Sequence, residues 1–326
     1  MVPFIVVVAL GFNFMNGFND AANSIATIVS TRALSPRMAV LWAALFNFIA
    51  FLLVTNVAAT IGVGIVDPRA VTNVVVLAGL LGAIMWDILA WYYGLPVSSS
   101  HALIGGLIGA AVVARGVGAL IWSGITKTLV FMALSPPIGF GLAFIFMAIT
   151  MWTMRSAAPV LVYRWFRRLQ LVSSALVSLG HGMNDAQKAM GVIALLLFVN
   201  GYLGATFYIP FWVMIACNLV IAAGTASGGW RIVKTMGMRI TKLEPVGACA
   251  AQMAAAVALL GTSYGGIPVS TTHTISGAIM GVGTSHRLTA VRWQVAMWMA
   301  WAWVLTMPAA AVMAGLMYLL LRFALG

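Results

Sequence analysis

Charged side chains are scarce in this chain. Of its 326 residues, 7% are charged and 63% are hydrophobic, and the mean hydropathy is +1.07. Soluble domains carry about 25% charged residues, so the composition excludes a soluble globular protein. Apolar stretches of about 20 residues, the length that a helix needs to cross a bilayer, recur along the chain, and the alternating pattern of a membrane barrel is missing. We therefore expect an all-α polytopic membrane protein.

Cysteine is almost absent as well. Cys217 and Cys249 lie apart in apolar segments, so we expect two small buried hydrophobic side chains and no disulfide or cysteine-rich metal site. The first apolar stretch follows no basic leader and contains no cleavage site of small residues, and we interpret it as part of a retained helix. No basic domain with interleaved aromatics is present, so nucleic acid is excluded as a partner.

Acidic residues are the scarcest charged type, with 5 Asp and Glu against 17 Lys and Arg. The basic side chains lie mostly in short connections between apolar segments, as the positive-inside rule predicts. This bias places both chain termini outside and residues 155–172 in the cytoplasm, in a multi-pass protein of the cell (cytoplasmic) membrane. The side expected to be cytoplasmic carries Arg32, Arg37, Arg115, Arg155, Arg164, Arg167, Arg168, Arg231, Lys234, Arg239 and Lys242, and the opposite side carries Arg69, Arg287, Arg292 and Arg322.

Two motifs occur twice, in the same order. "NGFNDAANS" (16–24) and "HGMNDAQKA" (181–189) share Gly-x-Asn-Asp, and "LPVSSSHALIGGLIGA" (95–110) matches "IPVSTTHTISGAIMGV" (267–282). The chain is therefore predicted to contain two internal repeats joined by a linker. Residues 1–154 form the N-terminal repeat, residues 155–172 a cytoplasmic linker, and residues 173–326 the C-terminal repeat.

Each repeat is expected to contain a helix broken at its Asn-Asp motif and a glycine-rich re-entrant hairpin at its Pro-Val-Ser motif. Each repeat is expected to cross the membrane five times, which gives about ten crossings in all plus the two hairpins. Because five is an odd number, the second repeat would be inverted relative to the first. Inverted-topology repeats with discontinuous helices are typical of secondary transporters. The hairpins are predicted over 97–114, entering from the cytoplasm, and 268–284, entering from outside. The crossings are predicted at 2–29, 38–60, 71–93, 118–134, 138–154, 173–199, 207–228, 244–263, 292–306 and 308–323.

Asp20 and Asp185 occupy matching positions in the two repeats. An aspartate inside a membrane helix costs roughly 2.5–3.5 kcal/mol on insertion scales, so it normally faces a cavity and has a partner. Inversion symmetry would bring the two carboxylates together, and their repulsion favours a bound cation or proton. Asn19, Asn23 and Asn184 add neutral oxygens suited to a monovalent cation. The alternative is a structural one, in which these side chains only pin broken helices.

The hairpin motifs place three hydroxyls at each predicted helix start, where free N–H groups and the helix dipole favour an anion. Two such starts facing each other would surround a tetrahedral oxyanion, although any single hydroxyl could also be an ordinary N-cap. His101 and His273 either donate or titrate there, or hold the hairpins in shape. Because bare carboxylates would repel an anion, a cation or proton must accompany it, which predicts symport. The hydroxyls are those of Ser98, Ser99, Ser100, Ser270, Thr271 and Thr272.

Together the four motifs resemble those of the inorganic phosphate transporter (PiT) family, over nearly the full chain. The resemblance implies cation-coupled phosphate symport through a pore at the repeat interface. It also implies that the following residues line the phosphate and cation sites: Asn19, Asp20, Asn23, Asn184, Asp185, Ser99, Ser100, Thr271 and Thr272. One departure is Lys188, which stands where the family's Gly-x-Asn-Asp-x-x-Asn pattern has its last asparagine. A tethered ammonium in place of a bound sodium ion favours the proton as coupling ion; a structural salt bridge to Asp185 is the alternative.

The sequence thus predicts a transporter that imports inorganic phosphate, not an enzyme, with no cofactor unless sodium travels as co-substrate and with a homo-oligomer left open. Symport of sulfate or another oxyanion, and an anion channel, are the alternatives; a Ser/His hydrolase is disfavoured because no Gly-x-Ser-x-Gly elbow occurs. Asp87 has no matching acid in the other repeat, and we expect milder effects from neutralising it. The substrate-binding residues are expected to be Ser98, Ser99, Ser100, Ser270, Thr271, Thr272, Asn19 and Asn184. The coupling-cation residues are expected to be Asp20, Asn23, Asp185 and Lys188, the first three being the candidate sodium ligands.

Overall fold

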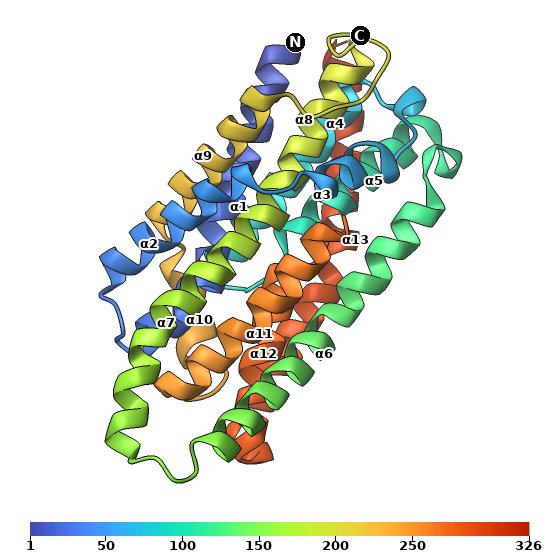
Figure 1. Ribbon diagram of the computed structural model, residues 1–326. Coiled ribbons are helices and arrows are strands. Elements are labelled where there is room, and N and C mark those ends of the chain that lie inside the picture. Colours follow the sequence, from blue (N-terminus) through green and yellow to red (C-terminus); the bar gives the residue numbers. More distant parts are fainter. Residues whose placement is uncertain (326) are drawn as a thin grey trace.

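Helices make up nearly all of the computed structural model, which describes residues 1–325 (Figure 1). Within these residues the one β feature is an isolated bridge between Val66 and Leu120. The predicted all-α fold is confirmed. The helices are α1 (Val2–Ser30), α2 (Pro36–Ile49), α3 (Asn56–Gly64), α4 (Asn73–Tyr93), α5 (Ser99–Arg115), α6 (Trp122–Thr153), α7 (Pro159–His181), α8 (Gln187–Val199), α9 (Phe211–Ser227), α10 (Trp230–Met238), α11 (Pro245–Tyr264), α12 (Thr271–His286) and α13 (Trp293–Leu325).

Five helices, α1, α4, α6, α11 and α13, are long and apolar enough to cross a membrane, and the number rises to seven if each of two bent helix pairs is one span. This is fewer than the ten crossings expected. Residues 118–134 and 138–154 belong to one helix, because α6 continues through Pro136 and Pro137. In the same way α13 continues through Pro308. Prolines are tolerated inside membrane helices when neighbouring helices satisfy the freed backbone groups.

We expected the helices to break at the Asn-Asp motifs, but the breaks lie elsewhere. α1 is continuous through Asn19 and Asp20, and the second motif forms a π-helical turn, Gly182–Ala186, between α7 and α8. Such turns often occur at functional sites. The sharp bends are instead between α2 and α3, at 76°, and between α9 and α10, at 71°. The polar motif side chains find partners on other helices, so the helices that carry them need not unwind.

Each predicted hairpin is a short extended segment followed by a single helix. α5 has 17 residues and α12 has 16. Pro96 and Pro268, which lack an N–H group and favour extended backbone before them, precede these helices. α5 and α12 therefore begin inside the bundle and end at its surface, beside the starts of α4 and α11, where Asp67 N–H donates to Ala119 O and Thr241 Oγ1 donates to Ala290 O. The re-entrant hairpins are thus the helix pairs α4–α5 and α11–α12, and not the motif segments alone.

The two ends of the molecule differ in charge. Met1 and the end of α13 lie at one end, here called the terminal end, and the α6–α7 connection lies at the other, the linker end (Figure 1). Arg115 lies at the terminal end, where Ile121 N–H donates to Ile65 O at 3.0 Å. Arg287 and Arg292 lie at the linker end, where Arg292 N–H donates to Ile240 O at 2.9 Å.

Each of these three arginines was expected at the other end of the molecule. The two hairpins were likewise expected to enter the bundle from the other end. Both errors have one cause, because residues 97–114 and 268–284 each contain one helix that runs in a single direction and turns back only against the helix before it, α4 or α11. The corrected positions leave twelve of the fifteen basic residues named in the sequence analysis at the linker end and three at the terminal end. The charge bias is therefore stronger than the sequence predicted.

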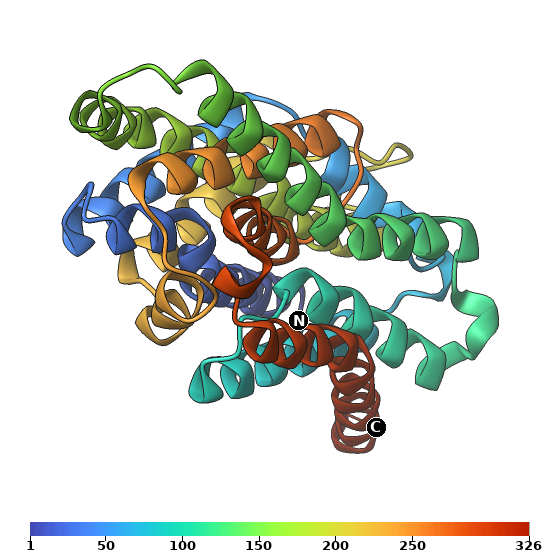
Figure 2. The same ribbon diagram turned by 90° about the horizontal axis from the view of Figure 1, so that it is seen from below.

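Each short helix packs mainly against the long final helix of the other half of the chain: α5 against α13, and α12 against α6. Glycines make this approach possible. A Cβ atom at Gly105 or Gly109 would collide with backbone of α13, and one at Gly277 or Gly281 with backbone of α6. Small residues commonly let membrane helices approach this closely. Seen from the linker end, α12 lies among the other helices near the middle of the bundle (Figure 2).

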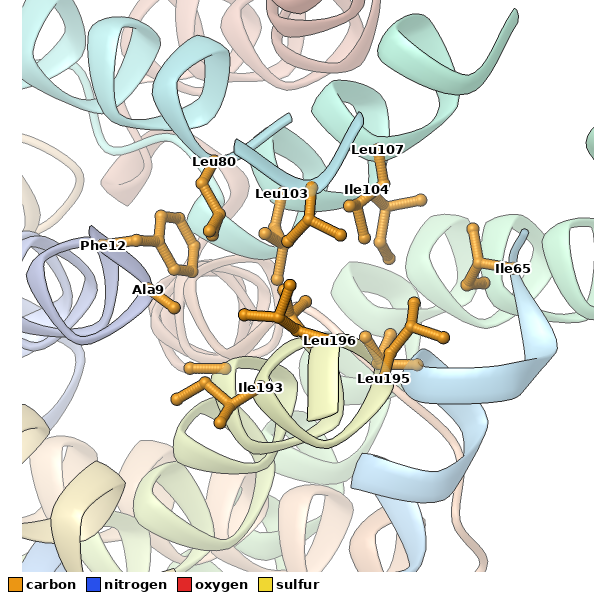
Figure 3. Close-up of a cluster of buried hydrophobic side chains, with 14 of the residues drawn as sticks. Ala9, Phe12, Ile65, Leu80, Leu103, Ile104, Leu107, Ile193, Leu195 and Leu196 are labelled. Atoms are coloured by element: carbon orange, nitrogen blue, oxygen red, sulfur yellow. The ribbon is translucent and has the colours of Figure 1, made fainter. Parts of the chain in front are cut away.

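An apolar core holds these helices together. Phe12 of α1, Leu80 of α4, Leu103 of α5 and Leu196 of α8 are buried and point into one cluster (Figure 3). Outside the bundle, large apolar side chains such as Phe144 of α6 and Trp301, Val304 and Leu305 of α13 are exposed. Exposed apolar surface of this extent indicates contact with lipid. Cys217 and Cys249 are buried free thiols.

Candidate functional site

Two buried aspartates from the two halves of the chain meet inside the bundle. Asp20 lies on α1 and Asp185 on the π-helical turn, and their side chains are 3% and 0% exposed. One ligand atom from each, together with a ring nitrogen of His181, lie within 4.8 Å of one another. The structure therefore brings together the two carboxylates that the sequence placed in matching positions.

The N-terminus of α12 lies between these carboxylates. Thr271 Oγ1 donates to Asp185 Oδ2 at 2.8 Å, and Thr272 Oγ1 donates to Asp20 Oδ1 at 2.9 Å. Asn23 Nδ2 donates to both threonine oxygens, at 3.1 and 3.0 Å. Because a hydroxyl has a single proton to give, each threonine is committed to one carboxylate.

Lys188 is buried beside Asp185 and is 1% exposed. Its ammonium group forms an ion pair with Asp185 Oδ1 and donates hydrogen bonds to Ser100 Oγ and to Val269 O, the latter at 2.9 Å. The i,i+3 spacing predicted the ion pair. The contacts to Ser100 and Val269 show that Lys188 also joins α8 to the start of α5 and to the segment before α12.

His181 is a residue of the site for which sequence reasoning found no role. Its Nε2 lies 3.1 Å from Asp185 Oδ2, and its Nδ1 lies 3.0 Å from Asn47 Oδ1. Asn47 Nδ2 in turn donates to Thr225 Oγ1 at 2.8 Å, so the network reaches α2 and α9. The sequence feature that could have identified His181 is the second Asn-Asp motif, in which His181 occupies the position that Asn16 has in the first motif.

Several expected site residues have other partners. The hydroxyls of Ser98 and Ser270 cap α5 and α12 by accepting from the backbone N–H groups of His101, at 3.4 Å, and His273, at 3.2 Å. They therefore behave as ordinary N-caps. The hydroxyl of Ser99, by contrast, has no hydrogen-bond partner.

The two asparagines that precede the aspartates point to other helices. Asn19 Nδ2 donates to the backbone oxygen of Asp87 on α4 at 3.2 Å. Asn184 Nδ2 donates to Ser263 Oγ on α11 at 3.4 Å. Of the expected hydroxyls, only those of Ser100, Thr271 and Thr272 thus converge on the aspartates and Lys188.

His101 and His273 stack on each other, with ring centroids 4.6 Å apart, and His273 stacks on Trp303 at 4.1 Å. The rings come from the first turns of α5 and α12, so the two helix starts meet near the site. The two helix starts are thus in contact through their stacked histidine rings.

Uncommitted oxygens and an excess of negative charge define what this site can bind. The amide oxygens of Asn19, Asn23 and Asn184 are buried and have no hydrogen-bond partner, and such neutral oxygens suit a small cation. With both aspartates ionised, two carboxylates face one ammonium. The site is therefore short of positive charge, and an oxyanion at the helix starts needs a cation or proton beside it.

Comparisons with known proteins agree with this chemistry. A family model described as "Phosphate transporter family" matches residues 16–314. A "Probable low-affinity inorganic phosphate transporter" of Rhizobium meliloti (strain 1021) is 55% identical over 315 residues, which cover 96% of this chain and 94% of that protein. A protein of the same description from Bacillus subtilis (strain 168) is 45% identical over 320 residues, covering 98% and 96%.

A solved structure described as "The sodium-dependent phosphate transporter" has a TM-score of 0.89 and 25% identity, and the match covers 99% of both chains. The family and these relatives are transporters, so the expectation that the chain is not an enzyme is confirmed. The family match over most of the chain and the two relatives of near-equal length establish that this chain belongs to the phosphate transporter family.

Proposed function

We propose that this protein imports inorganic phosphate across the cell membrane by symport with a cation, and that the cation is the proton rather than sodium. The observation that carries the proposal is the pair of threonine hydroxyls at the start of α12. They donate to Asp20 and Asp185, the carboxylates of the two halves. A cation bound at the carboxylates and a phosphate bound at the start of α12 would therefore be linked through the same two hydroxyls.

The hydrogen bonds suggest how anion and cation are coupled. While Asp20 is ionised, it holds the proton of the Thr272 hydroxyl, which cannot then be given to a phosphate oxygen. A proton on Asp20 weakens this hydrogen bond, because charge-assisted hydrogen bonds are about twice as strong as neutral ones. Protonation of Asp20 thus releases a donor for phosphate and also removes a negative charge that repels it.

Lys188 supports the choice of the proton. Its ammonium group contacts three oxygens, from Asp185, Ser100 and Val269, that a bound sodium ion would otherwise use as ligands. Asp185 is therefore neutralised by the chain itself, and Asp20 is left for the coupling ion. The structural relative described as sodium-dependent is only 25% identical.

We infer that both chain termini lie outside the cell and that the linker end faces the cytoplasm. Twelve of the fifteen basic residues named in the sequence analysis lie at the linker end and three at the terminal end, and segments rich in Lys and Arg near the ends of membrane helices are retained in the cytoplasm. The packing of α5 on α13 and of α12 on α6 supports two inverted repeats, residues 1–154 and 173–326. The linker, 155–172, includes the first part of α7.

The experiment that tests this function is uptake of radiolabelled phosphate into proteoliposomes that contain the purified protein. We expect an imposed pH gradient, but not a sodium gradient, to drive phosphate above equilibrium, and a protonophore to abolish the accumulation. A tenfold excess of sulfate should not reduce uptake. Phosphate that only equilibrates would indicate a channel, strictly sodium-driven accumulation would contradict proton coupling, and competition by sulfate would favour a broader oxyanion carrier.

The two threonines provide a further prediction. The double variant Thr271→Ala/Thr272→Ala should weaken phosphate binding at least tenfold, because each hydrogen bond to a charged group contributes about 1.5–3 kcal/mol and tenfold in affinity corresponds to about 1.4 kcal/mol. Binding of radiolabelled phosphate to purified protein measures the effect. Thr274→Ala is the matched control, since its hydroxyl donates only to Ser270 O within the same helix. Wild-type affinity in a well-folded double variant would refute this role of the threonines.

A further inference from the structure

A third carboxylate, that of Asp87 on α4, is buried apart from the central site. Its side chain is 0% exposed, and neither carboxylate oxygen has a hydrogen-bond partner. Among residues 1–325, the salt bridges all involve Asp185, so Asp87 has no basic partner there. An ionised carboxylate taken out of water without a partner costs several kcal/mol.

Two other polar atoms near Asp87, one on Asn19 and one on Ser99, also lack hydrogen-bond partners. Asn19 lies against this part of α4, since its Nδ2 donates to Asp87 O at 3.2 Å, and its own Oδ1 is unpaired. Ser99 is the first residue of α5, which packs along α4, and its hydroxyl also has no hydrogen-bond partner. Asn19 is 3% and Ser99 0% exposed. Three buried groups from α1, α4 and α5 are thus left unsatisfied at one place.

The charged groups on the surrounding helices do not neutralise Asp87. α1 contributes Asp20, which is itself acidic, and α8 contributes Lys188, which is paired with Asp185. Arg231 of α10 donates to Tyr92 O at 2.7 Å and lies over the ring of Trp91. α5 contributes His101, stacked on His273. On α13, the residue facing this part of α4 is Thr306, which accepts from the Trp86 indole.

One proton on Asp87 would supply what all three groups lack. A protonated carboxyl group has one O–H to donate and an oxygen left to accept, which complement the Oδ1 of Asn19 and the hydroxyl of Ser99. We propose that Asp87, with Asn19 and Ser99, forms a second proton-binding site, which takes up a proton on the outer side and releases it inside with each phosphate. The carboxylate gains the proton on loading and is regenerated on release, so no other reactant is needed.

The proton site shares structure with the central site. Ser99 is followed by Ser100, whose hydroxyl accepts from Lys188, and Asn19 is followed by Asp20. Binding of a proton to Asp87 therefore changes the hydrogen bonds of Ser99 and Asn19. Their neighbours in the chain, Ser100 and Asp20, belong to the central site. The inference rests on the proposed symport for its role in transport, but the protonation itself does not depend on it.

The first test measures protonation directly. Infrared spectra of the purified protein at neutral pH should contain the carbonyl band of a buried carboxylic acid that Asp87→Asn removes. Asp67→Asn is the control, since Asp67 is a loop residue that caps a short helix by accepting from Arg69 N–H. Ser99→Ala should keep the band but shift it, because it removes a hydrogen-bond donor to Asp87. A spectrum that Asp87→Asn and Ser99→Ala leave unchanged would overturn the proton site.

The second test measures coupling in proteoliposomes. Each proton that accompanies phosphate multiplies the accumulation ratio about tenfold per unit of imposed pH gradient, so Asp87→Asn should lower steady-state accumulation about tenfold at a gradient of one pH unit. Asp67→Asn should match the wild type. Unchanged accumulation in Asp87→Asn would refute the carrier role, and accumulation driven by sodium in the wild type but not in Asp87→Asn would reassign the site to sodium. If the wild type does not concentrate phosphate at all while the infrared band is present, the symport proposal fails and the proton site stands.

Discussion

Asp20→Asn is expected to remove proton coupling at the central site, so that steady-state accumulation of phosphate under an imposed gradient of one pH unit falls at least about tenfold. The variant can neither bind a proton at this position nor return to a charged state. Its amide oxygen can still accept the hydrogen bond from Thr272, which is 2.9 Å long in the wild type. The fold should therefore survive, and only the coupling should be lost.

The measurement compares accumulation at steady state with the thermal unfolding of the same purified variant. Asp67→Asn, at the exposed loop before α4, again serves as the control, and we expect it to accumulate phosphate like the wild type. A folded Asp20→Asn variant that still concentrates phosphate, with unchanged dependence on the pH gradient, would show that Asp20 is not a coupling residue.

Lys188→Met is expected to have the second large effect, on both stability and transport. The substitution removes the counter-charge of Asp185, and breaking a buried ion pair from one side typically costs about 3–5 kcal/mol. The same reasoning applies to Asp185→Asn, which leaves the ammonium group unpaired. Among residues 1–325 the ion pairs all involve Asp185, so neutralising Asp20 breaks none of them, whereas neutralising Asp185 removes the partner of Lys188.

A double variant separates the contribution of the ion pair to stability from its contribution to transport. Asp185→Asn/Lys188→Gln removes both charges together and should unfold at a higher temperature than either single variant, yet remain without concentrative uptake. If the double variant is no more stable than the two single variants, the ion pair does not account for their loss of stability.

Lys188→Asn tests the tethered cation. This substitution restores the asparagine of the family's pattern and opens space for an ion, so uptake by Lys188→Asn should depend on sodium. Lys188→Met offers no oxygen ligand to an ion, so it should remain without transport in the presence of sodium. Uptake by the wild type under separate sodium and pH gradients is the reference. Strictly sodium-driven uptake by the wild type, with two sodium ions for each phosphate, would contradict the tethered cation and leave only the structural salt bridge.

The composition and the duplicated motifs were sufficient for the class of protein and for the residues at its centre. The apolar stretches predicted membrane helices because the transfer of side chains into lipid depends on local composition. The matching positions of Asp20 and Asp185 predicted their meeting, since inverted repeats place equivalent residues around one axis. The spacing of Lys188 from Asp185 predicted their ion pair, because residues three apart share a helix face.

Other features were decided by contacts between helices that are distant in sequence. α6 remains one helix through its two prolines because it packs along α12 of the other half. The hydroxyl of Ser100 meets Lys188 from 88 residues away, whereas that of its neighbour Ser99 has no hydrogen-bond partner. His181 enters the site through Asn47 of α2. A motif determines which polar groups are buried, but only the tertiary structure determines which partners reach them, because a hydrogen bond requires atoms to approach within about 3 Å and that approach depends on how all the helices pack.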